Sequence, residues 1–455
     1  MMRQLESLMG KESFKKGIQH YLKNYAFDNA VWNDLVELLD KETAVDLKDW
    51  SEIWVNRSSR PIFKALLKYD ADGNITTFHL TQDAEDGSDG IWPQTFDITF
   101  VYGDTLKPIT AEIRSKNSEM TAAKGFKKPD AIRYNSNGLG YGVFPVDLEY
   151  LSDIPNIKDD VARGYTYINT YENTLNGALP ATAVFESYQK SLSSEKNELL
   201  LNLTSSYLNS IFWSYLTTEQ QHRYQQILEK QLIFELRSEH PSDIKKILFE
   251  RFTSIAYTAS GTKMLYDIWK QKEIIPDLKL NQDDFTDMAM DLAFYGHVDG
   301  TEILEEAKKQ LTNPDKLERF NFLLPSLSKD GTTRDLFFES MKEEKNRAKE
   351  GWTLTAMGYL NHPLRQKEAL KYLAPSLELL EEVQKTGDIF FPKGWLNSTI
   401  GQYTSPEAYE ILKTFIKDRP NLNPALLKKL LQASDNLRRV QFLRKKDAIP
   451  LGIEP

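Results

Sequence analysis

The chain has 455 residues, 40% of them hydrophobic, and a formal net charge of −9, which suits a globular protein of two to four domains. Nucleic acids and anionic membranes require clustered Lys and Arg, so this acidic balance argues against both as partners. The absence of cysteine excludes disulfides, thiolate metal sites and cysteine nucleophiles. No apolar run approaches the roughly 18 residues that would suggest a membrane span, and the composition does not select a compartment.

Residues 1–60 predict three or four short helices with large apolar faces, because apolar residues recur three and four positions apart. The helices are separated by residues that stop or cap a helix, namely Gly10, Asp28, Asn29 and Asp46. Fewer than about seventy residues seldom form an independent core. We therefore expect the segment to be the end of a larger domain. Where that domain is absent, apolar surface is expected at Trp32, Trp50 and Trp54.

Between residues 61 and 148 the hydrophobic period changes from helical to alternating. Short strands are predicted at 62–68, 75–82, 94–101, 109–113, 131–134 and 142–146. The segments between them are rich in Gly, Asn, Asp and Ser, which favour turns. Short strands at this density predict a compact β-sandwich.

From residue 149 to residue 455 nearly the whole chain is predicted to be helical. Helix starts are marked by capping residues or by first-turn prolines at Pro180, Thr217, Pro241, Asn281, Pro314, Ser405 and Asn423. Helix pairs recur about every 40 residues, which is the period of HEAT-like and ARM-like hairpins. The spacing predicts an irregular, curved α-solenoid. The segment Gly387–Tyr403 is expected to interrupt it as a loop.

Specific residues carry a family resemblance. The closing segment of the catalytic domain in aminopeptidase N-type zinc metallopeptidases is similar to Gly10–Ile18, Tyr21-Leu22, Tyr25–Ala30, Asp34-Leu35, Trp54 and Pro61. Landmarks of that family's small β-domain resemble Gln82, Trp92-Pro93 and Asn135–Gly142.

The resemblance implies three parts: residues 1–60 as the terminal helices of a truncated thermolysin-like catalytic domain, 61–148 as the β-sandwich, and 149–455 as the helical-repeat domain. The family's His-Glu-x-x-His zinc site, its further Glu and its catalytic Tyr would all lie upstream of Met1, as would any signal peptide. Zinc is thus expected in the full-length enzyme and not on this chain. Such enzymes release N-terminal amino acids from peptides. This chain would supply the spacer and the helical cover of the active site, with peptide substrates and the missing N-terminal catalytic half as its partners.

The histidines provide an argument that does not depend on the family. They are His20, His79, His222, His240, His297 and His362. A helical zinc site needs two imidazoles four residues apart, so that both reach the metal from one face. No two histidines lie that close. No catalytic or metal-ligating residue is therefore predicted, and the sequence does not identify substrate-binding residues.

Two segments are compatible with a ligand-binding site and also with a purely structural role. The aromatic residues Phe390, Phe391 and Trp395 around Lys393 would line a ligand cavity or fold back onto the helical core. The acidic segment Asp83–Asp89 has the oxygen density of a calcium site, but its spacing does not match an EF-hand. We expect a packed loop in the first case and a solvated hairpin in the second.

Two charged clusters are equally open to a functional interpretation. Acid/base chemistry would use paired carboxylates such as Glu378, Glu381 and Glu382. Nucleic-acid binding would use a basic cluster such as Arg438-Arg439 with Arg444-Lys445-Lys446. Solvated helix faces are expected for both. Because the Gly-x-Ser-x-Gly, phosphate-loop and dinucleotide glycine motifs do not occur, the main alternative is a free-standing helical-repeat scaffold. Such a scaffold would bind a protein or peptide on its concave face.

Overall fold

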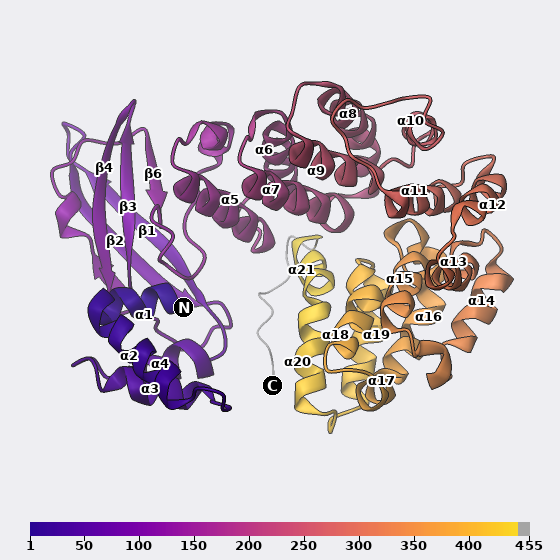
Figure 1. Ribbon diagram of the computed structural model, residues 1–455. Helices are drawn as coiled ribbons and strands as arrows, with labels where there is room; N and C mark the ends of the chain where they lie inside the picture. Colours follow the sequence, from indigo (N-terminus) through magenta and orange to yellow (C-terminus); the bar gives the residue numbers. More distant parts are fainter. Residues whose placement is uncertain (445–455) are drawn as a thin grey trace. The chain divides into compact units, whose positions relative to one another are not determined.

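The computed structural model describes residues 1–444, which fall into two compact units, residues 1–184 and residues 185–444 (Figure 1). The first unit contains short helices and all the strands of the described chain, and the second is helical. The fold is therefore multidomain α plus β, as predicted. No helix within residues 1–444 combines the length and the apolar character needed to cross a membrane.

The first unit opens with the predicted short helices. They are α1 (Met2–Met9), α2 (Lys11–Asn24), α3 (Trp32–Asp40), α4 (Leu47–Ser51) and the π-helical turn η1 (Glu52–Asn56). Gly10 separates α1 from α2 with φ of +82°, a value that costs glycine little. The Asp46 carboxylate caps α4 by accepting from two backbone N–H groups at 3.0 Å.

These helices have a small core of their own, made of Leu5, Met9, Val36, Leu39, Leu47 and Trp50. The expected exposure of Trp50 is therefore wrong, since only 8% of it is exposed. Trp32 and Trp54 are half-buried against the same cluster. The exposed apolar side chains are instead Leu22, Phe27 and Val31.

Helices α2 and α3 approach each other closely at Gly17 of α2. A Cβ atom at Gly17 would lie 2.5 Å from Leu39 Cδ2 and 3.3 Å from Leu39 Cα of α3. Alanine usually stabilises a helix by up to about 1 kcal/mol relative to glycine. We expect the opposite sign for Gly17→Ala, a loss of about 1–2 kcal/mol, because the helices must separate. Hydrogen exchange of α2 and α3 amides measures this change. Gln19→Ala on the exposed face is the control, and slower exchange in Gly17→Ala would contradict the packing.

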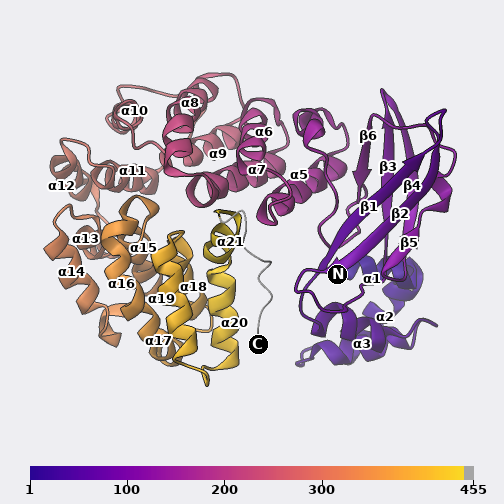
Figure 2. The same cartoon turned by 180° about the vertical axis from the view of Figure 1, so that it is seen from behind.

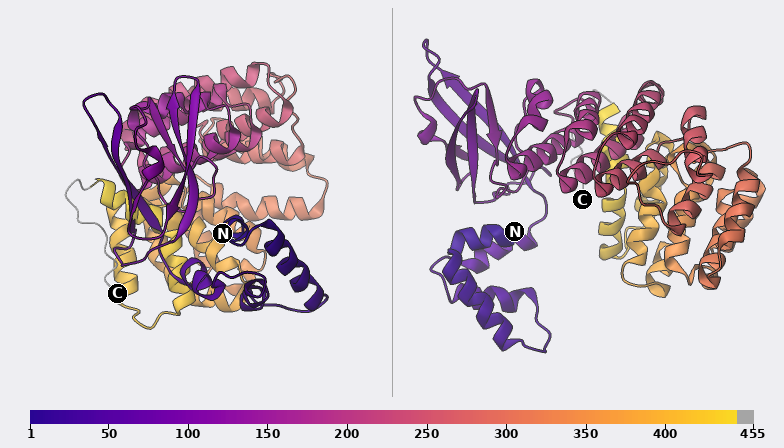
Figure 3. Two further views of the ribbon diagram at one scale, coloured as in Figure 1. Left: turned by 90° about the vertical axis from the view of Figure 1, so that its left-hand side faces the viewer. Right: turned by 45° about the horizontal axis from the view of Figure 1, so that its top comes forward.

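Two three-stranded antiparallel sheets form the predicted sandwich, with strand orders β1-β2-β5 and β4-β3-β6 (Figures 2 and 3). The strands are β1 (Pro61–Tyr69), β2 (Ile75–Ala84), β3 (Gln94–Tyr102), β4 (Thr105–Ile113), β5 (Asn117–Glu119) and β6 (Ala131–Tyr134). Alternate residues of both sheets, such as Phe78, Leu80, Phe96 and Phe100, point into a shared core.

The sheets differ from the sequence prediction at three places. The strand predicted at 142–146 is wrong, because Val143 forms only an isolated bridge with Ile62, and Pro145 has no N–H with which to extend it. The short strand β5 was not predicted. The strand β4 begins at Thr105 and includes Pro108, which an edge strand tolerates.

The sandwich is joined to helix α5 (Asp160–Leu175) within the first unit. Arg60, just before β1, forms ion pairs of 2.7 Å with both Glu85 after β2 and Glu172 of α5. Asn173 of α5 donates to the carbonyl of Phe144 at 2.7 Å. A partly buried three-residue ion network thus links the strands to α5.

The helical region starts with α6 and continues through the second unit. Its helices are α6 (Ala181–Ser194), α7 (Glu198–Ser210), α8 (Thr218–Arg237), α9 (Ser242–Thr253), α10 (Ala259–Trp269), α11 (Gln282–Phe294), α12 (Gly300–Gln310), α13 (Pro314–Leu327), α14 (Gly331–Ser340), α15 (Glu350–Leu360), α16 (Gln366–Glu378), α17 (Leu380–Thr386), α18 (Phe391–Ser398), α19 (Pro406–Lys417), α20 (Pro424–Ala433) and α21 (Asp435–Arg444). The predicted starts are confirmed, and the capping box between Thr217 and Gln220 is formed.

Helices of the second unit pack on their neighbours in sequence and on the next helix but one, as α7 does on α9 and α13 on α15. The last helix returns to the first ones: the Tyr215 hydroxyl in the π-helical turn η4 (Ile211–Tyr215) donates to Asn436 Oδ1 of α21 at 2.7 Å. Segments more than 200 residues apart in the chain therefore meet within this unit.

The loop predicted at Gly387–Tyr403 is wrong, because helix α18 (Phe391–Ser398) and the 3-10 turn η7 (Ile400–Gln402) together occupy most of it. Asp388 Oδ1 accepts from the backbone N–H groups of Phe390 and Phe391 at 2.6 and 2.8 Å, which starts the helix. Gly394 lies inside it because a Cβ there would come within 2.5 Å of Leu354 Cδ1. The glycine and proline of this segment therefore serve close packing and helix initiation.

Candidate functional site

The aromatic residues around Lys393 do not form one cavity wall. Phe391 and Trp395 are buried, and Trp395 Nε1 donates to the carbonyl of Ser376 at 2.9 Å. Phe390 is 76% exposed, and Lys393 is also exposed. The structure separates these side chains, so they present no joint ligand site.

The charged clusters form ion pairs. Glu378 pairs with Arg419, and Glu382 pairs with Arg347, whose side chain is buried. Arg439 contacts Asp435 of its own helix at 2.6 Å. Lys445 and Lys446 lie outside the described residues.

The carboxylates at the end of β2 and in the loop that follows it also contact other groups of the protein. Asp83 accepts from Lys64 at 3.0 Å and contacts Lys116 at 3.2 Å. The hydrogen bond from Lys64 holds the pKa of Asp83 below its ordinary value. Asp86 accepts from Ser88. These contacts account for the clustered carboxylates.

The described residues do not fit the zinc ion that the resemblance implies for the whole enzyme. Within residues 1–444 there is no group of three or more His, Asp or Glu side chains placed to hold a metal ion. His20 contacts Glu42 at 3.0 Å and His240 contacts Glu235 at 2.8 Å, each with one carboxylate.

The second unit contains a polar cavity of about 440 Å³. Its walls come from η4, the C-terminal end of α9, α11, and the segments 362–363 and 401–402. Its lining includes Trp213, Ser254, Asp291, Tyr295, His362 and Gln402. Helix starts could be predicted from the sequence. No sequence motif, however, indicates that these separate segments lie together around one cavity.

Asp291 is an ionisable group of this cavity whose pKa is strongly raised. Its carboxylate is half-buried and accepts from the Tyr359 hydroxyl at 3.3 Å. Burial, and then the neighbouring Asp287, raise its pKa to about 8. Tyr295 beside it donates its hydroxyl to the carbonyl of Thr253 at 2.8 Å. Burial and the charge of Asp291 raise the pKa of Tyr295 well above its ordinary value.

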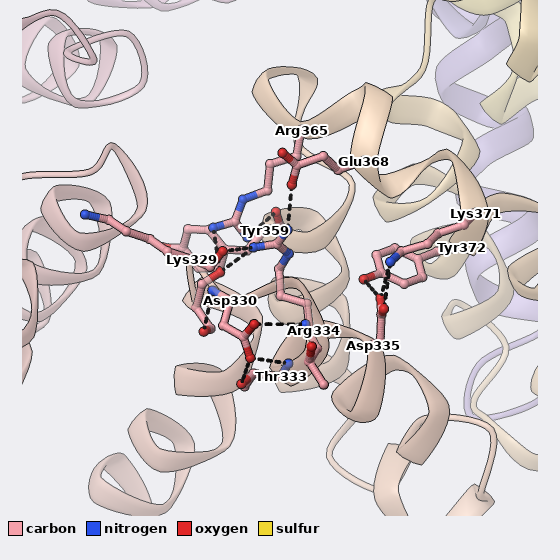
Figure 4. A network of polar contacts seen from close by, with 12 residues as sticks. Lys329, Asp330, Thr333, Arg334, Asp335, Tyr359, Arg365, Glu368, Lys371 and Tyr372 are labelled. Atoms are coloured by element: carbon pink, nitrogen blue, oxygen red, sulfur yellow. Dashed lines mark hydrogen bonds and ion pairs between the residues drawn. The ribbon is translucent and has the colours of Figure 1, made fainter.

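A polar network surrounds Tyr359 (Figure 4). Arg365 donates to the carbonyls of Ser326 at 2.6 Å and Tyr359 at 3.4 Å. Arg334 pairs with Glu368 at 2.5 Å in the same network. These contacts of Arg365 and Arg334 help to fix the backbone around Tyr359.

His362 contributes a neutral ring to the cavity wall. Burial, and then the charge of Arg365, lower its pKa to about 3. Its Nδ1 accepts from the backbone N–H of Leu364 at 3.2 Å, so the ring proton lies on Nε2. The Trp213 ring packs edge-on against it with centroids 5.0 Å apart.

The pKa of Asp291 predicts a pH-dependent stability difference. In the unfolded chain an Asp loses its proton near pH 3.9, about 4 units below the folded value. The folded state keeps that proton longer, so the contribution of Asp291 to stability is present below pH 4 and is lost as the pH rises towards 8. We expect Asp291→Asn to unfold like the wild type at pH 4 and to gain stability towards pH 8, by at most about 1.4 kcal/mol per pH unit. Urea unfolding at several pH values measures this, and a constant difference would contradict it.

A second cavity of about 720 Å³ adjoins the first. The two share Trp213 and Pro363 in their linings. The second is lined further by residues such as His222, Tyr257 and Lys367. The shared residues show that the two cavities are neighbours within the second unit.

Comparison with known proteins finds a family match at the start of the chain. The sequence profile of the "Peptidase family M1 domain" matches residues 1–56. "Aminopeptidase N" of Streptomyces lividans is 37% identical over 84 residues, which is 18% of this chain and 10% of that protein. These matches relate the start of the chain to the M1 peptidase family. "Puromycin-sensitive aminopeptidase" of Caenorhabditis elegans is 23% identical over 193 residues, 40% of this chain and 20% of that protein.

The fold of the chain has a counterpart among solved structures. Legionella pneumophila aminopeptidase A, solved in complex with aspartic acid, superposes with a TM-score of 0.59 at 11% identity. The match covers 96% of this chain and 55% of the Legionella chain. The chain thus spans about half the length of that structure, and the sequence matches cover still smaller shares of the relatives.

Proposed function

We propose that this chain is the non-catalytic C-terminal portion of a zinc aminopeptidase that releases N-terminal amino acids from peptides. It supplies the β-sandwich spacer and a HEAT-like helical cover, and a separate catalytic segment supplies the zinc site. The observation that carries the proposal is the family match over residues 1–56, on a helical segment that leaves apolar side chains uncovered.

Those side chains form the docking face for the catalytic segment. Leu22 is 62% exposed, Val31 is 66% exposed and Phe27 is fully exposed. Phe27 also has φ of +65°, in the left-handed region that bulky residues rarely adopt. The exposed ring and the strained backbone both raise the free energy of the isolated segment. Burial of the ring against a partner would offset that cost.

Complementation tests this proposal. The purified chain alone is expected to show no zinc-dependent cleavage of aminoacyl reporter substrates. Turnover is expected when an M1 catalytic segment carrying His-Glu-x-x-His is co-expressed as a second polypeptide. Phe27→Asp should weaken that complex, whereas Val298→Asp, at an equally exposed position of the second unit, should not. Robust zinc-dependent turnover by the chain alone would refute the proposal.

A second candidate is a free-standing scaffold that binds a protein or peptide. The two adjoining cavities of the second unit favour it, because neither needs any residue outside that unit. Failure of complementation together with retained peptide binding would select this alternative.

A further inference from the structure

The acidic residues of α11 are paired with cations, with one exception. Asp283 pairs with Lys316 at 2.5 Å, Asp284 pairs with Lys246, and Asp287 lies 3.9 Å from Arg319. For Asp291, by contrast, no Lys or Arg lies within ion-pair distance among the described residues, and its polar contact is the Tyr359 hydroxyl. This carboxylate is the one that lines the cavity.

Aromatic rings surround the unpaired carboxylate. Tyr295 and His362 line the cavity with it, and Trp213 closes the side shared with the second cavity. The Trp213 and Tyr257 rings lie 5.6 Å apart, and Tyr257 and Tyr295 lie 6.2 Å apart. Aromatic rings that line a cavity together with an acidic group favour a cation, through the ring quadrupole and through the negative charge that the acid carries once it is ionised.

We propose that this cavity binds an organic cation, the guanidinium or ammonium group of a basic peptide side chain, with Asp291 as its counter-ion. The volume of about 440 Å³ accommodates such a side chain, and the adjoining cavity provides room for the residues that flank it. The site uses residues of the second unit alone, so it does not depend on the proposed catalytic complex.

The charges around the cavity do not favour an anion. His362 is neutral at physiological pH because burial lowers its pKa. Arg365 lies on the far side of Phe294, with its guanidinium carbon 4.5 Å from that ring centre, and its Nη groups donate to backbone carbonyls. The acidic group available to a ligand in this cavity is therefore Asp291, which a bound cation would hold in its ionised, negatively charged form.

Titration calorimetry with the full chain tests the proposal. The probe is the peptide acetyl-Ala-Arg-Ala-amide, and its match carries citrulline, which has the same shape without the charge. We expect the arginine peptide to bind at least about tenfold more tightly, and Asp291→Asn to remove that preference. Asp287→Asn, one helical turn earlier, is the matched control and should retain it. Equal affinity for the two peptides, or an unaffected Asp291→Asn variant, would overturn the proposal.

Proton release is a second readout that a merely structural carboxyl group would not give. The titratable groups facing Asp291 are Asp287 and Tyr295 at its own helix, Tyr359 of α15, and His362. The tyrosines stay protonated and His362 stays neutral near pH 7. Binding a permanent cation should therefore expel close to one proton, from Asp291, near pH 7. Calorimetry in two buffers of different ionisation enthalpy measures that number, and zero release would count against the site.

Free polyamines carry the same cationic chemistry. Spermidine is therefore titrated in parallel with the arginine peptide. Tighter binding of the peptide supports a basic side chain as the ligand. Binding of spermidine alone would overturn the peptide assignment.

Discussion

Replacing Trp395 by alanine is expected to lower the free energy of unfolding of the helical unit by about 3–5 kcal/mol. The Trp395 side chain has no exposed area, and its Nε1 donates to the carbonyl of Ser376 at 2.9 Å. The Phe391 ring packs edge-on against it at 6.2 Å between centroids. Truncation leaves a cavity between α18 and its neighbours and removes the hydrogen bond. Urea unfolding followed by far-ultraviolet circular dichroism measures the loss.

Phe390 provides the matched control for this experiment. It precedes α18 in the same segment, but its ring is 76% exposed. Phe390→Ala should change the free energy of unfolding by no more than about 0.5 kcal/mol. Similar effects of the two substitutions would mean that the segment is a surface loop.

The same segment shows why local sequence signals were insufficient. The segment predicted as a loop contains Pro392 and Gly394, and proline and glycine usually interrupt helices. Pro392 instead lies in the first turn of α18, where its missing N–H costs nothing. Gly394 is required by Leu354, a contact from a helix about 40 residues earlier in the chain. Contacts between residues this far apart in the chain cannot be inferred from the local sequence pattern.

Other elements were predictable because their signals are local. The caps at Asp46, Thr217 and Asn281 bond to N–H groups two or three residues away, so sequence spacing alone specifies them. The alternation in β1 to β3 follows from one buried face. The division of the chain at residues 60 and 148 stays a prediction.

The candidate site could not be predicted in this way. Its lining comes from five separated segments between residues 209 and 402. The aspartates of α11 recur at four-residue spacing, Asp283 to Asp287 to Asp291, which places them on one helix face. Which of them lacks a cation depends on where Lys316 and Arg319 of α13 lie, and that is a property of the packed fold.

Replacing Arg60 by alanine is expected to lower the free energy of unfolding of the first unit by about 3 kcal/mol. Arg60 pairs with Glu85 and Glu172 at 2.7 Å, and the three side chains are each about one-fifth to one-quarter exposed. Burial acts to lower the pKa of Arg60, but the two carboxylates outweigh it and hold the pKa above its ordinary value. Removing the guanidinium leaves two poorly hydrated carboxylates facing each other between β2 and α5. The loss is expected near the lower end of the range for buried pairs because water reaches part of the network.

Two further variants separate this network from a general loss of charge. Lys64→Ala breaks the pair with Asp83, whose side chains are 69% and 39% exposed, and should cost less than about 1 kcal/mol. Adding Glu172→Gln to Arg60→Ala removes one of the orphaned carboxylates and should recover part of the stability. Urea unfolding of the four proteins, followed by hydrogen exchange of β1 and α5 amides, measures both effects. If Arg60→Ala cost no more than Lys64→Ala, the network would not be what joins the sandwich to α5.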